Sequence, residues 1–157
     1  MTLPPEIVSG IRRAVAEHGG VRAAMLEALR LIQHAEGWVS DARLAAAAEL
    51  LGVTTAELDS VATFYSMIFR RPVGARLILL CDGAVCHLNG ADAVRDAVVA
   101  RLGINPGETT ADGTYTLLSI ACVGGCDRAP AAVLGRDRKL TGPVFPDNID
   151  ALLADAG

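Results

Sequence analysis

Apolar residues recur every three or four positions through the first third of the chain, which is the period of amphipathic α-helices. In residues 6–17 this spacing is carried by Ile7, Ile11 and Val15. A second helix is predicted from residue 21 to near Gly37, because glycine commonly follows the last turn of a helix. The apolar face of this second helix consists of Val21, Met25, Leu29 and Ile32.

Two further helices are indicated by their capping residues. Ser40 is a favourable N-cap for a helix over Asp41–Leu51. Thr54 and Glu57 have the spacing of a capping box, which opens a fourth helix. Residues 1–72 are therefore predicted to form a small helical bundle, the first of two domains.

The hydrophobic pattern changes near residue 73. Residues 76–80 and 115–120 are short apolar runs with the length of buried strands, and residues 90–102 between them have helical spacing. Asn89 is the expected N-cap of this intervening helix. A strand–helix–strand unit of this kind should have parallel strands joined by a right-handed crossover.

The last quarter of the chain adds a hairpin and a helix. Residues 131–134 and 138–140 flank a turn-forming stretch at Gly135, and a final helix should bury Ile149, Leu152 and Leu153. The predicted fold class is therefore α+β. It consists of the helical bundle over residues 1–72 and an α/β domain over residues 73–157.

Four cysteines, the whole complement of the chain, lie in this second domain. They are Cys81, Cys86, Cys122 and Cys126, in the order C-x4-C, 35 intervening residues, C-x3-C. Each pair follows a predicted strand directly or almost directly. Because parallel strands end at the same edge of a sheet, we expect the two pairs to converge there.

The spacing is compatible with several uses of the thiols. A [2Fe–2S] cluster fits because each iron takes two thiolates, and the two pairs can come from separate loops. A structural zinc site with four cysteine ligands also tolerates these spacings, and unligated thiols remain a third interpretation. Structural disulfides are disfavoured without an export signal, and a thioredoxin-type redox pair would need C-x-x-C.

Composition narrows the class of protein further. Of the 157 residues, 52% are hydrophobic but only 4% are aromatic, and the mean hydropathy is +0.38. No apolar run reaches the 18 or so residues of a membrane span, so burial against a partner subunit or simple alanine enrichment explains this hydropathy. The net charge of −4 argues against nucleic-acid binding. The N-terminus has neither the basic nor the apolar region of a signal peptide, so we expect a cytoplasmic protein.

Three stretches carry a resemblance to a known family: residues 61–74 (VATFYSMIFRRPVG), 81–90 (CDGAVCHLNG) and 122–130 (CVGGCDRAP). They resemble the E subunit of bacterial NADH–quinone oxidoreductase (respiratory complex I), which belongs to the thioredoxin-like [2Fe–2S] ferredoxins. The resemblance implies a thioredoxin-like second domain and one [2Fe–2S] cluster per chain. It also implies that all four cysteines are ligands. Val123 replaces the usual leucine, and the last helix opens with Phe145 where relatives often have threonine.

The resemblance also implies a function. In that family the cluster exchanges electrons with the FMN of the NADH-binding flavoprotein (the F subunit), within the peripheral arm of the membrane-bound complex. This chain contains no G-x-G-x-x-G fingerprint and no P-loop. We therefore expect an electron-transfer subunit with FMN only on the partner, unable to oxidise NADH alone. The alternatives are the small [2Fe–2S] subunit of an NAD-dependent formate dehydrogenase or NAD-reducing hydrogenase, and a zinc-stabilised interaction module.

Other residues near the cysteines are assigned supporting roles. Gly83, Gly124 and Gly125 should leave room for backbone N–H groups to point at sulfur. His87 is not expected to be a ligand, because the set of four cysteines is complete without it. Asp82 and Asp127 each adjoin a cysteine.

An aromatic segment, residues 63–69, precedes the junction between the two predicted domains. We expect it to pack one domain on the other, to dock a partner, or to do both. Arg70, Arg71 and Arg76 follow it and are expected to form a solvated charge run, with an acidic partner as the alternative.

Overall fold

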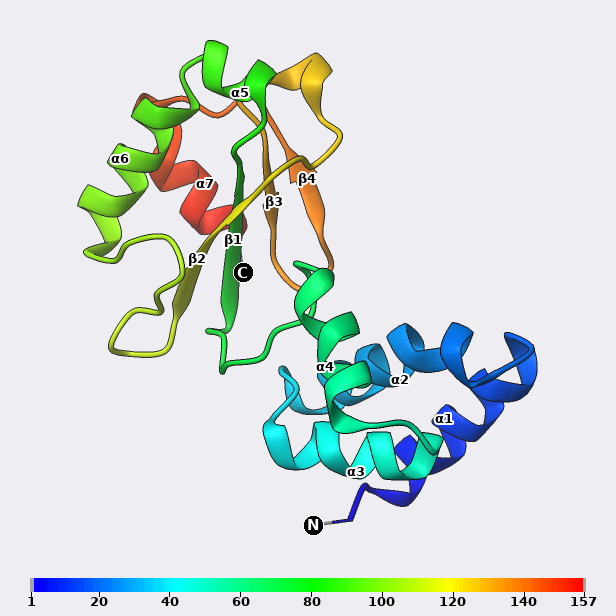
Figure 1. The fold of residues 1–157 in the computed structure, drawn as a ribbon. Coiled ribbons are helices and arrows are strands. Elements are labelled where there is room, and N and C mark those ends of the chain that lie inside the picture. Colours follow the sequence, from blue (N-terminus) through cyan, green and yellow to red (C-terminus); the bar gives the residue numbers. More distant parts are fainter. Residues whose placement is uncertain (1, 157) are drawn as a thin grey trace. The chain divides into compact units, whose positions relative to one another are not determined.

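The computed structural model describes residues 2–156, and the chain divides into two compact units between Pro72 and Val73. The first unit is helical and the second contains a sheet covered by helices (Figure 1). The predicted α+β fold with N-terminal helices is thereby confirmed.

The helical unit contains α1 (Pro5–Glu17), α2 (Val21–Glu36), α3 (Asp41–Leu51) and α4 (Thr55–Phe64). The predicted caps are present. The Ser40 hydroxyl accepts a hydrogen bond from the Arg43 N–H at 3.3 Å at the start of α3. At the start of α4, the Thr54 hydroxyl accepts from the Glu57 N–H at 3.1 Å. The Glu57 carboxylate accepts from the Thr54 N–H at 3.0 Å in return, which completes the capping box.

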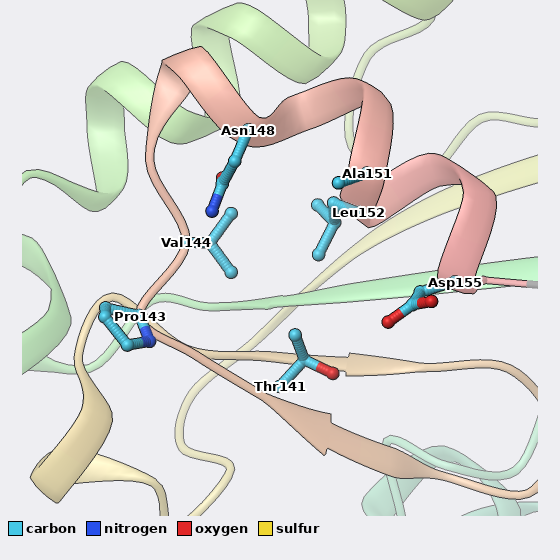
Figure 2. Close-up of a pocket in the computed structure, with 7 residues that line it drawn as sticks. All are labelled: Thr141, Pro143, Val144, Asn148, Ala151, Leu152 and Asp155. Carbon is cyan, nitrogen blue, oxygen red and sulfur yellow. The ribbon is translucent and has the colours of Figure 1, made fainter.

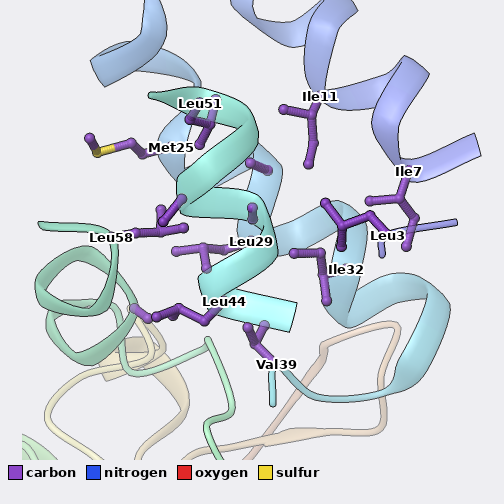
Figure 3. Packing of buried hydrophobic residues seen from close by; sticks show 14 of the residues in the cluster. Leu3, Ile7, Ile11, Met25, Leu29, Ile32, Val39, Leu44, Leu51 and Leu58 are labelled. Carbon is purple, nitrogen blue, oxygen red and sulfur yellow. The ribbon is translucent and has the colours of Figure 1, made fainter. Parts of the chain in front are cut away.

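The apolar faces of these helices form one core (Figure 3). Its largest fully buried side chains are Ile11, Leu29, Ile32, Val39, Leu44 and Leu58. Val15 and Val21 are only half-buried, because they lie near helix ends at the margin of this core. Burial of these apolar side chains is the main favourable contribution to the folding of the bundle.

The segment after α4 is anchored to the helical unit by two polar side chains. The Gln33 amide donates to the Met67 carbonyl at 2.9 Å and accepts from the Phe69 N–H at 2.6 Å. The Arg70 guanidinium pairs with Asp59 at 2.9 Å and with Asp41 at 2.6 Å. The expectation of a solvated charge run is therefore wrong for Arg70.

The second unit is built on a mixed sheet. It comprises β1 (Arg76–Cys81), β2 (Tyr115–Ile120), β3 (Ala132–Leu134) and β4 (Lys139–Thr141) in the order β2-β1-β3-β4. As predicted, β1 and β2 are parallel, with Cys81 opposite Ile120. The predicted hairpin joins β3 and β4, and β3 runs antiparallel to β1.

Helices α6 (Ala91–Leu102) and α7 (Ile149–Asp155) pack on one face of this sheet. The core between them contains Ile78, Leu117 and Leu134 from the strands with Val94, Val98, Ile149, Leu152 and Leu153 from the helices. Arg76 lies at the edge of this core. Its guanidinium is over the Tyr115 ring, with Cζ 5.5 Å from the ring centroid. The charge-run expectation is thus also wrong for Arg76, whereas Arg71 is exposed.

Two features of this unit differ from expectation. A five-residue helix, α5 (Ala84–Leu88), stands where only a loop was expected. Asn89 does not cap α6. Its side-chain amide donates to the Val85 carbonyl at 2.7 Å, so it closes α5 instead. The left-handed backbone of Gly90, with φ of 93°, separates the two helices and leaves Asn89 on the α5 side.

Irregular segments complete the second unit. Single 3₁₀ turns span Cys126–Arg128 (η1) and Pro146–Asn148 (η2). At the second of these, the Phe145 N–H donates to the Asn148 side-chain oxygen at 2.8 Å. The Ala129–Pro130 and Gly142–Pro143 peptide bonds are cis.

Among residues 2–156 no helix combines the length and the apolarity that are needed to cross a bilayer.

Candidate metal centre

The parallel pairing of β1 and β2 brings both cysteine segments to one edge of the sheet. Cys81 is the last residue of β1, and its N–H donates to the Ala131 carbonyl at 3.1 Å. The next residue, Asp82, donates to the Ile120 carbonyl at the end of β2 at 2.8 Å. In Figure 1, α5 and the gold turn η1 lie together at this end of the sheet.

The two cysteine pairs differ in exposure. Cys81 is 4% exposed and Cys86 is 1% exposed, and they form a small buried cluster with Ala131. Cys122 and Cys126 are exposed. The first pair is therefore held inside the fold, at the end of a strand and on the inner side of α5, whereas the second pair faces solvent.

Hydrogen bonds to sulfur oppose the effect of burial at Cys81. Burial alone raises the pKa of the Cys81 thiol. The backbone N–H groups of Gly83 and Val123, together with the thiols of Cys86 and Cys122, lower that pKa below its ordinary value overall. A hydrogen bond donated to the thiolate stabilises the ionised form and therefore lowers the pKa. Cys81 is thus the point at which the two cysteine segments meet.

At Cys86 the opposing effects leave the pKa of the thiol raised instead of lowered. Burial raises the pKa of the Cys86 thiol, and the nearby sulfurs of Cys81 and Cys126 raise it further. The Ala131 N–H donates to this sulfur and offsets only part of that rise. A cation would relieve both the burial and the crowding of these sulfurs, since metal binding favours the deprotonated thiolate.

The three glycines of the site have different roles. The Gly83 N–H points at Cys81, and the Gly124 N–H donates to the Cys122 sulfur at 3.4 Å, as the sequence suggested. Gly125 serves packing instead. A Cβ there would lie 3.1 Å from both the Ala131 Cβ and the Leu140 side chain. Gly125 therefore lets the second cysteine segment lie directly on β4.

Two charged residues beside the cysteines form ion pairs with neighbouring side chains. The His87 imidazole pairs with Asp92 at 3.1 Å and is exposed. Asp127 pairs with Arg128 at 3.0 Å, and the hydrogen bond from that guanidinium lowers the pKa of Asp127.

The donor set fits an iron–sulfur cluster. Within residues 2–156 no three His, Cys, Asp or Glu side chains are gathered closely enough to form a ready metal-holding group, but the sulfur contacts of Cys81 and Cys86 extend to Cys122 and Cys126. Thiols with backbone N–H groups directed at them are the usual ligands and supports of such clusters. Sequence reasoning missed two parts of the site, α5 and the Ala131 N–H. No local signal identifies the Ala131 N–H, because Ala131 lies 45 residues beyond Cys86 in the chain.

A pocket elsewhere in the second unit contains no cysteine (Figure 2). It has a volume of about 220 Å³ and is lined by Thr141, Pro143, Val144, Asn148, Ala151, Leu152 and Asp155. The buried Thr141 hydroxyl lacks a hydrogen-bond partner within residues 2–156.

A sheet edge lined by four thiols is typical of an iron–sulfur protein. Comparison with known proteins identifies the family. The chain belongs to the thioredoxin-like [2Fe–2S] ferredoxin family, whose profile matches residues 11–157. The [2Fe–2S] cluster is accordingly its cofactor, one per chain. This assignment decides between the two metals that the cysteine spacing had left open.

Within this family the chain is similar to the E subunit of NADH–quinone oxidoreductase. It is 43% identical to the E subunit of Pseudomonas aeruginosa over 145 residues, which cover 92% of this chain and 86% of the relative. It is also 43% identical to the Escherichia coli protein of the same name over 131 residues, or 82% and 79% of the two chains. The predicted resemblance is thereby confirmed.

The fold is also similar to part of a solved structure. The crystal structure of NAD⁺-reducing [NiFe]-hydrogenase superposes on 84% of this chain with a TM-score of 0.69 at 28% identity. This chain matches only 22% of that hydrogenase chain, so the similarity concerns a module within a larger protein.

Proposed function

We propose that this chain is an electron-transfer subunit of an NADH–quinone oxidoreductase, in which its [2Fe–2S] cluster exchanges electrons with the flavin of an NADH-oxidising partner. One observation carries the proposal. Two cysteine pairs meet at one sheet edge of a chain that is 43% identical over 92% of its length to the E subunit of such a complex. In this role the cluster stores one electron at a time, next to the partner's flavin, which accepts two.

The ligands in this proposal are Cys81, Cys86, Cys122 and Cys126. The contacts of Cys81 with both Cys86 and Cys122 support this set, because they link the two pairs. The buried pair holds its side of the site rigidly within β1 and α5. The exposed pair faces solvent, where a partner protein can reach it.

Metal analysis tests the ligand set. The anaerobically purified chain should contain about two irons and no stoichiometric zinc, because each iron of a [2Fe–2S] cluster takes two thiolates. Changing any single cysteine to serine should lower the iron content and the visible absorbance, whereas the same measurements on the wild type set the reference. One equivalent of zinc in a colourless protein would contradict the proposal.

The chain acts without an NADH site of its own. Its sequence contains no dinucleotide fingerprint or P-loop. Electrons therefore enter from another protein, the FMN-carrying flavoprotein known as the F subunit, and the chain contributes no catalytic residue. In this proposal it lies with other peripheral-arm subunits on the cytoplasmic side of the membrane, and its two compact units, residues 1–72 and 73–157, are separate domains.

Reduction by NADH tests the relay. The visible band of the cluster should persist when NADH is added to the isolated chain and should bleach when the flavoprotein is also present. Dithionite serves as a control that the cluster can be reduced in both samples. Bleaching by NADH without the flavoprotein would overturn the relay. No bleaching with the flavoprotein would also overturn it, provided that redox titration places the cluster's potential above that of the NAD⁺/NADH couple.

The hydrogenase similarity favours a second candidate. The same module in an NAD⁺-reducing [NiFe]-hydrogenase has a TM-score of 0.69 to this chain, so an analogous role beside a hydrogenase or formate dehydrogenase is the alternative. Co-purification distinguishes the two. Membrane proteins in the native complex support the oxidoreductase, whereas a nickel or molybdenum protein supports the alternative.

A further inference from the structure

We propose that Gly142 is a positioning residue for the cluster, because it sets where the turn η1 lies against the sheet and hence where the Cys126 sulfur lies. The inference rests on the proposed function, since it takes Cys126 as one of the four ligands. Gly142 directly follows Thr141, the last residue of β4. It acts through the backbone of Arg128, the last residue of η1.

Cys126 is held in a different way from the buried cysteines. Cys86 packs with Cys81 and Ala131 inside the fold, so the packing of its own side chain fixes its sulfur. Cys126 is exposed, so packing around its side chain contributes little to its position. A metal site nevertheless needs its ligands held close to the geometry that the metal requires. The backbone that carries Cys126 must therefore be fixed by other contacts.

Gly142 allows the end of β4 to lie directly against the end of η1. A Cβ at position 142 would collide with the Arg128 carbonyl oxygen and would lie 3.2 Å from the Pro130 carbonyl oxygen. Both oxygens belong to the backbone, so no side-chain rotation relieves these contacts. The φ of Gly142 lies outside the left-handed region, so the requirement is for space. The Val144 N–H also donates to the Pro130 carbonyl at 2.8 Å, which holds the same two segments together.

A second contact with β4 lies on the other side of Cys126. A Cβ at Gly125 would lie 3.1 Å from Cδ1 of Leu140, a residue of β4. Leu140 and Gly142 are two residues apart, which is the spacing of one face of an extended chain. The end of β4 therefore supports the cysteine segment both directly before and directly after Cys126.

The far end of this segment is fixed to the strands. The Ala131 carbonyl accepts from the Cys81 N–H at 3.1 Å, and Ala132 pairs with Thr141 between β3 and β4. A displacement of η1 from β4 would therefore move Cys126 relative to the buried cysteines. Groups that orient metal ligands also tune the properties of the metal, so the spectrum and the retention of the cluster should report this displacement.

The test uses the full chain with its cluster assembled anaerobically. Gly142→Ala should push η1 away from β4, shift the EPR g values of the reduced cluster and release iron to a chelator several-fold faster than the wild type. Wild-type g values and iron release in a folded Gly142→Ala protein would overturn the proposal. If that variant does not fold, Leu140→Ala decides, because it removes a support without introducing a clash. It should produce the same two changes, and wild-type behaviour would overturn the proposal.

Gly135→Ala is the matched control, at the other end of the β3–β4 hairpin. Because Gly135 has a φ of +69°, this variant should unfold at a lower urea concentration, but its g values and iron release should equal those of the wild type. The same spectral shift in Gly135→Ala would indicate a general effect of lost stability and would overturn the role of Gly142. A wild-type spectrum in Cys126→Ser would instead refute the proposed ligand set, so the two failures are distinguishable.

Discussion

At the scale of single residues, the cysteine site depends on glycines for two different physical reasons. A Cβ at Gly83 would lie 3.0 Å from the Ala121 carbonyl oxygen and 3.5 Å from the Cys81 sulfur. Gly124 has open space around the same position but a φ of +75°, which other residues rarely adopt. The first glycine provides room beside sulfur, and the second provides a backbone conformation.

These reasons predict different outcomes for two alanine variants. Gly124→Ala should lower the free energy of unfolding by about 1 kcal/mol through backbone strain, with little change in the EPR spectrum. The added Cβ of Gly83→Ala should push the loop away from the Ala121 carbonyl oxygen and so alter the EPR spectrum or the iron content. Urea unfolding and EPR of the reduced protein measure the two effects. The reverse assignment, with the spectrum altered by Gly124→Ala alone, would contradict this account.

At the scale of elements, local capping decides where the helices of the first unit begin. Thr54 and Glu57 satisfy each other's backbone N–H groups at the start of α4. In the second unit, the left-handed backbone of Gly90 separates α6 from α5, the short helix that stands where only a loop was expected. A cap is a short-range interaction, so its effect should be confined to its own helix.

The α4 cap can be tested by removing the threonine hydroxyl. Thr54→Ala should reduce the free energy of unfolding of the helical unit by about 1 kcal/mol. Hydrogen exchange in the intact protein should show the loss of protection at the first turn of α4. Ser60→Ala, further along the exposed side of the same helix, is the matched control and should have a much smaller effect.

The same cap makes a prediction about pH. The backbone and side-chain hydrogen bonds from Thr54 lower the pKa of Glu57 below 4.5. A lowered folded-state pKa means that the stabilisation is present above 4.5 and is lost as the pH falls through the folded value. NMR titration should find this pKa below 4.5 in the wild type and closer to 4.5 in Thr54→Ala. An identical pKa in both proteins would exclude the Thr54 hydroxyl as a cause of the shift, since the backbone N–H of residue 54 is present in both.

At the scale of the whole molecule, the chain consists of two compact units with separate cores. All four cysteines belong to the second unit, and the core of the first contains none of them. With the four cysteines as the proposed ligands, the cluster crosslinks the segments after β1 and β2 and has no ligand in the helical unit.

Loss of the cluster should accordingly affect the two units unequally. Cys86→Ala should remove the metal and lower hydrogen-exchange protection in β1, β2 and α5, because metal binding contributes to folding of the site. Protection in α2 and α3 should remain close to that of the wild type. Equal loss in both units would argue against separate domains.

The sequence by itself determined the features that depend on neighbouring residues. Helical periodicity, the Ser40 and Thr54 caps and the turn before β4 act over a few residues, and all were predicted correctly. The two strands before the cysteines were also identifiable, because both are short apolar runs. Parallel pairing then follows from the connecting helix, so the shared edge of the cysteine pairs was predictable.

Tertiary structure decided the features that depend on distant residues. It buries Cys86 by placing Ala131 against it and engages Arg70 with Asp41 and Asp59, partners that no local pattern identifies. It also shapes α5, which is too short at five residues to show a helical period. The sequence therefore determined which chemistry the chain carries, whereas packing decided which sulfurs are buried and which face of α5 remains exposed.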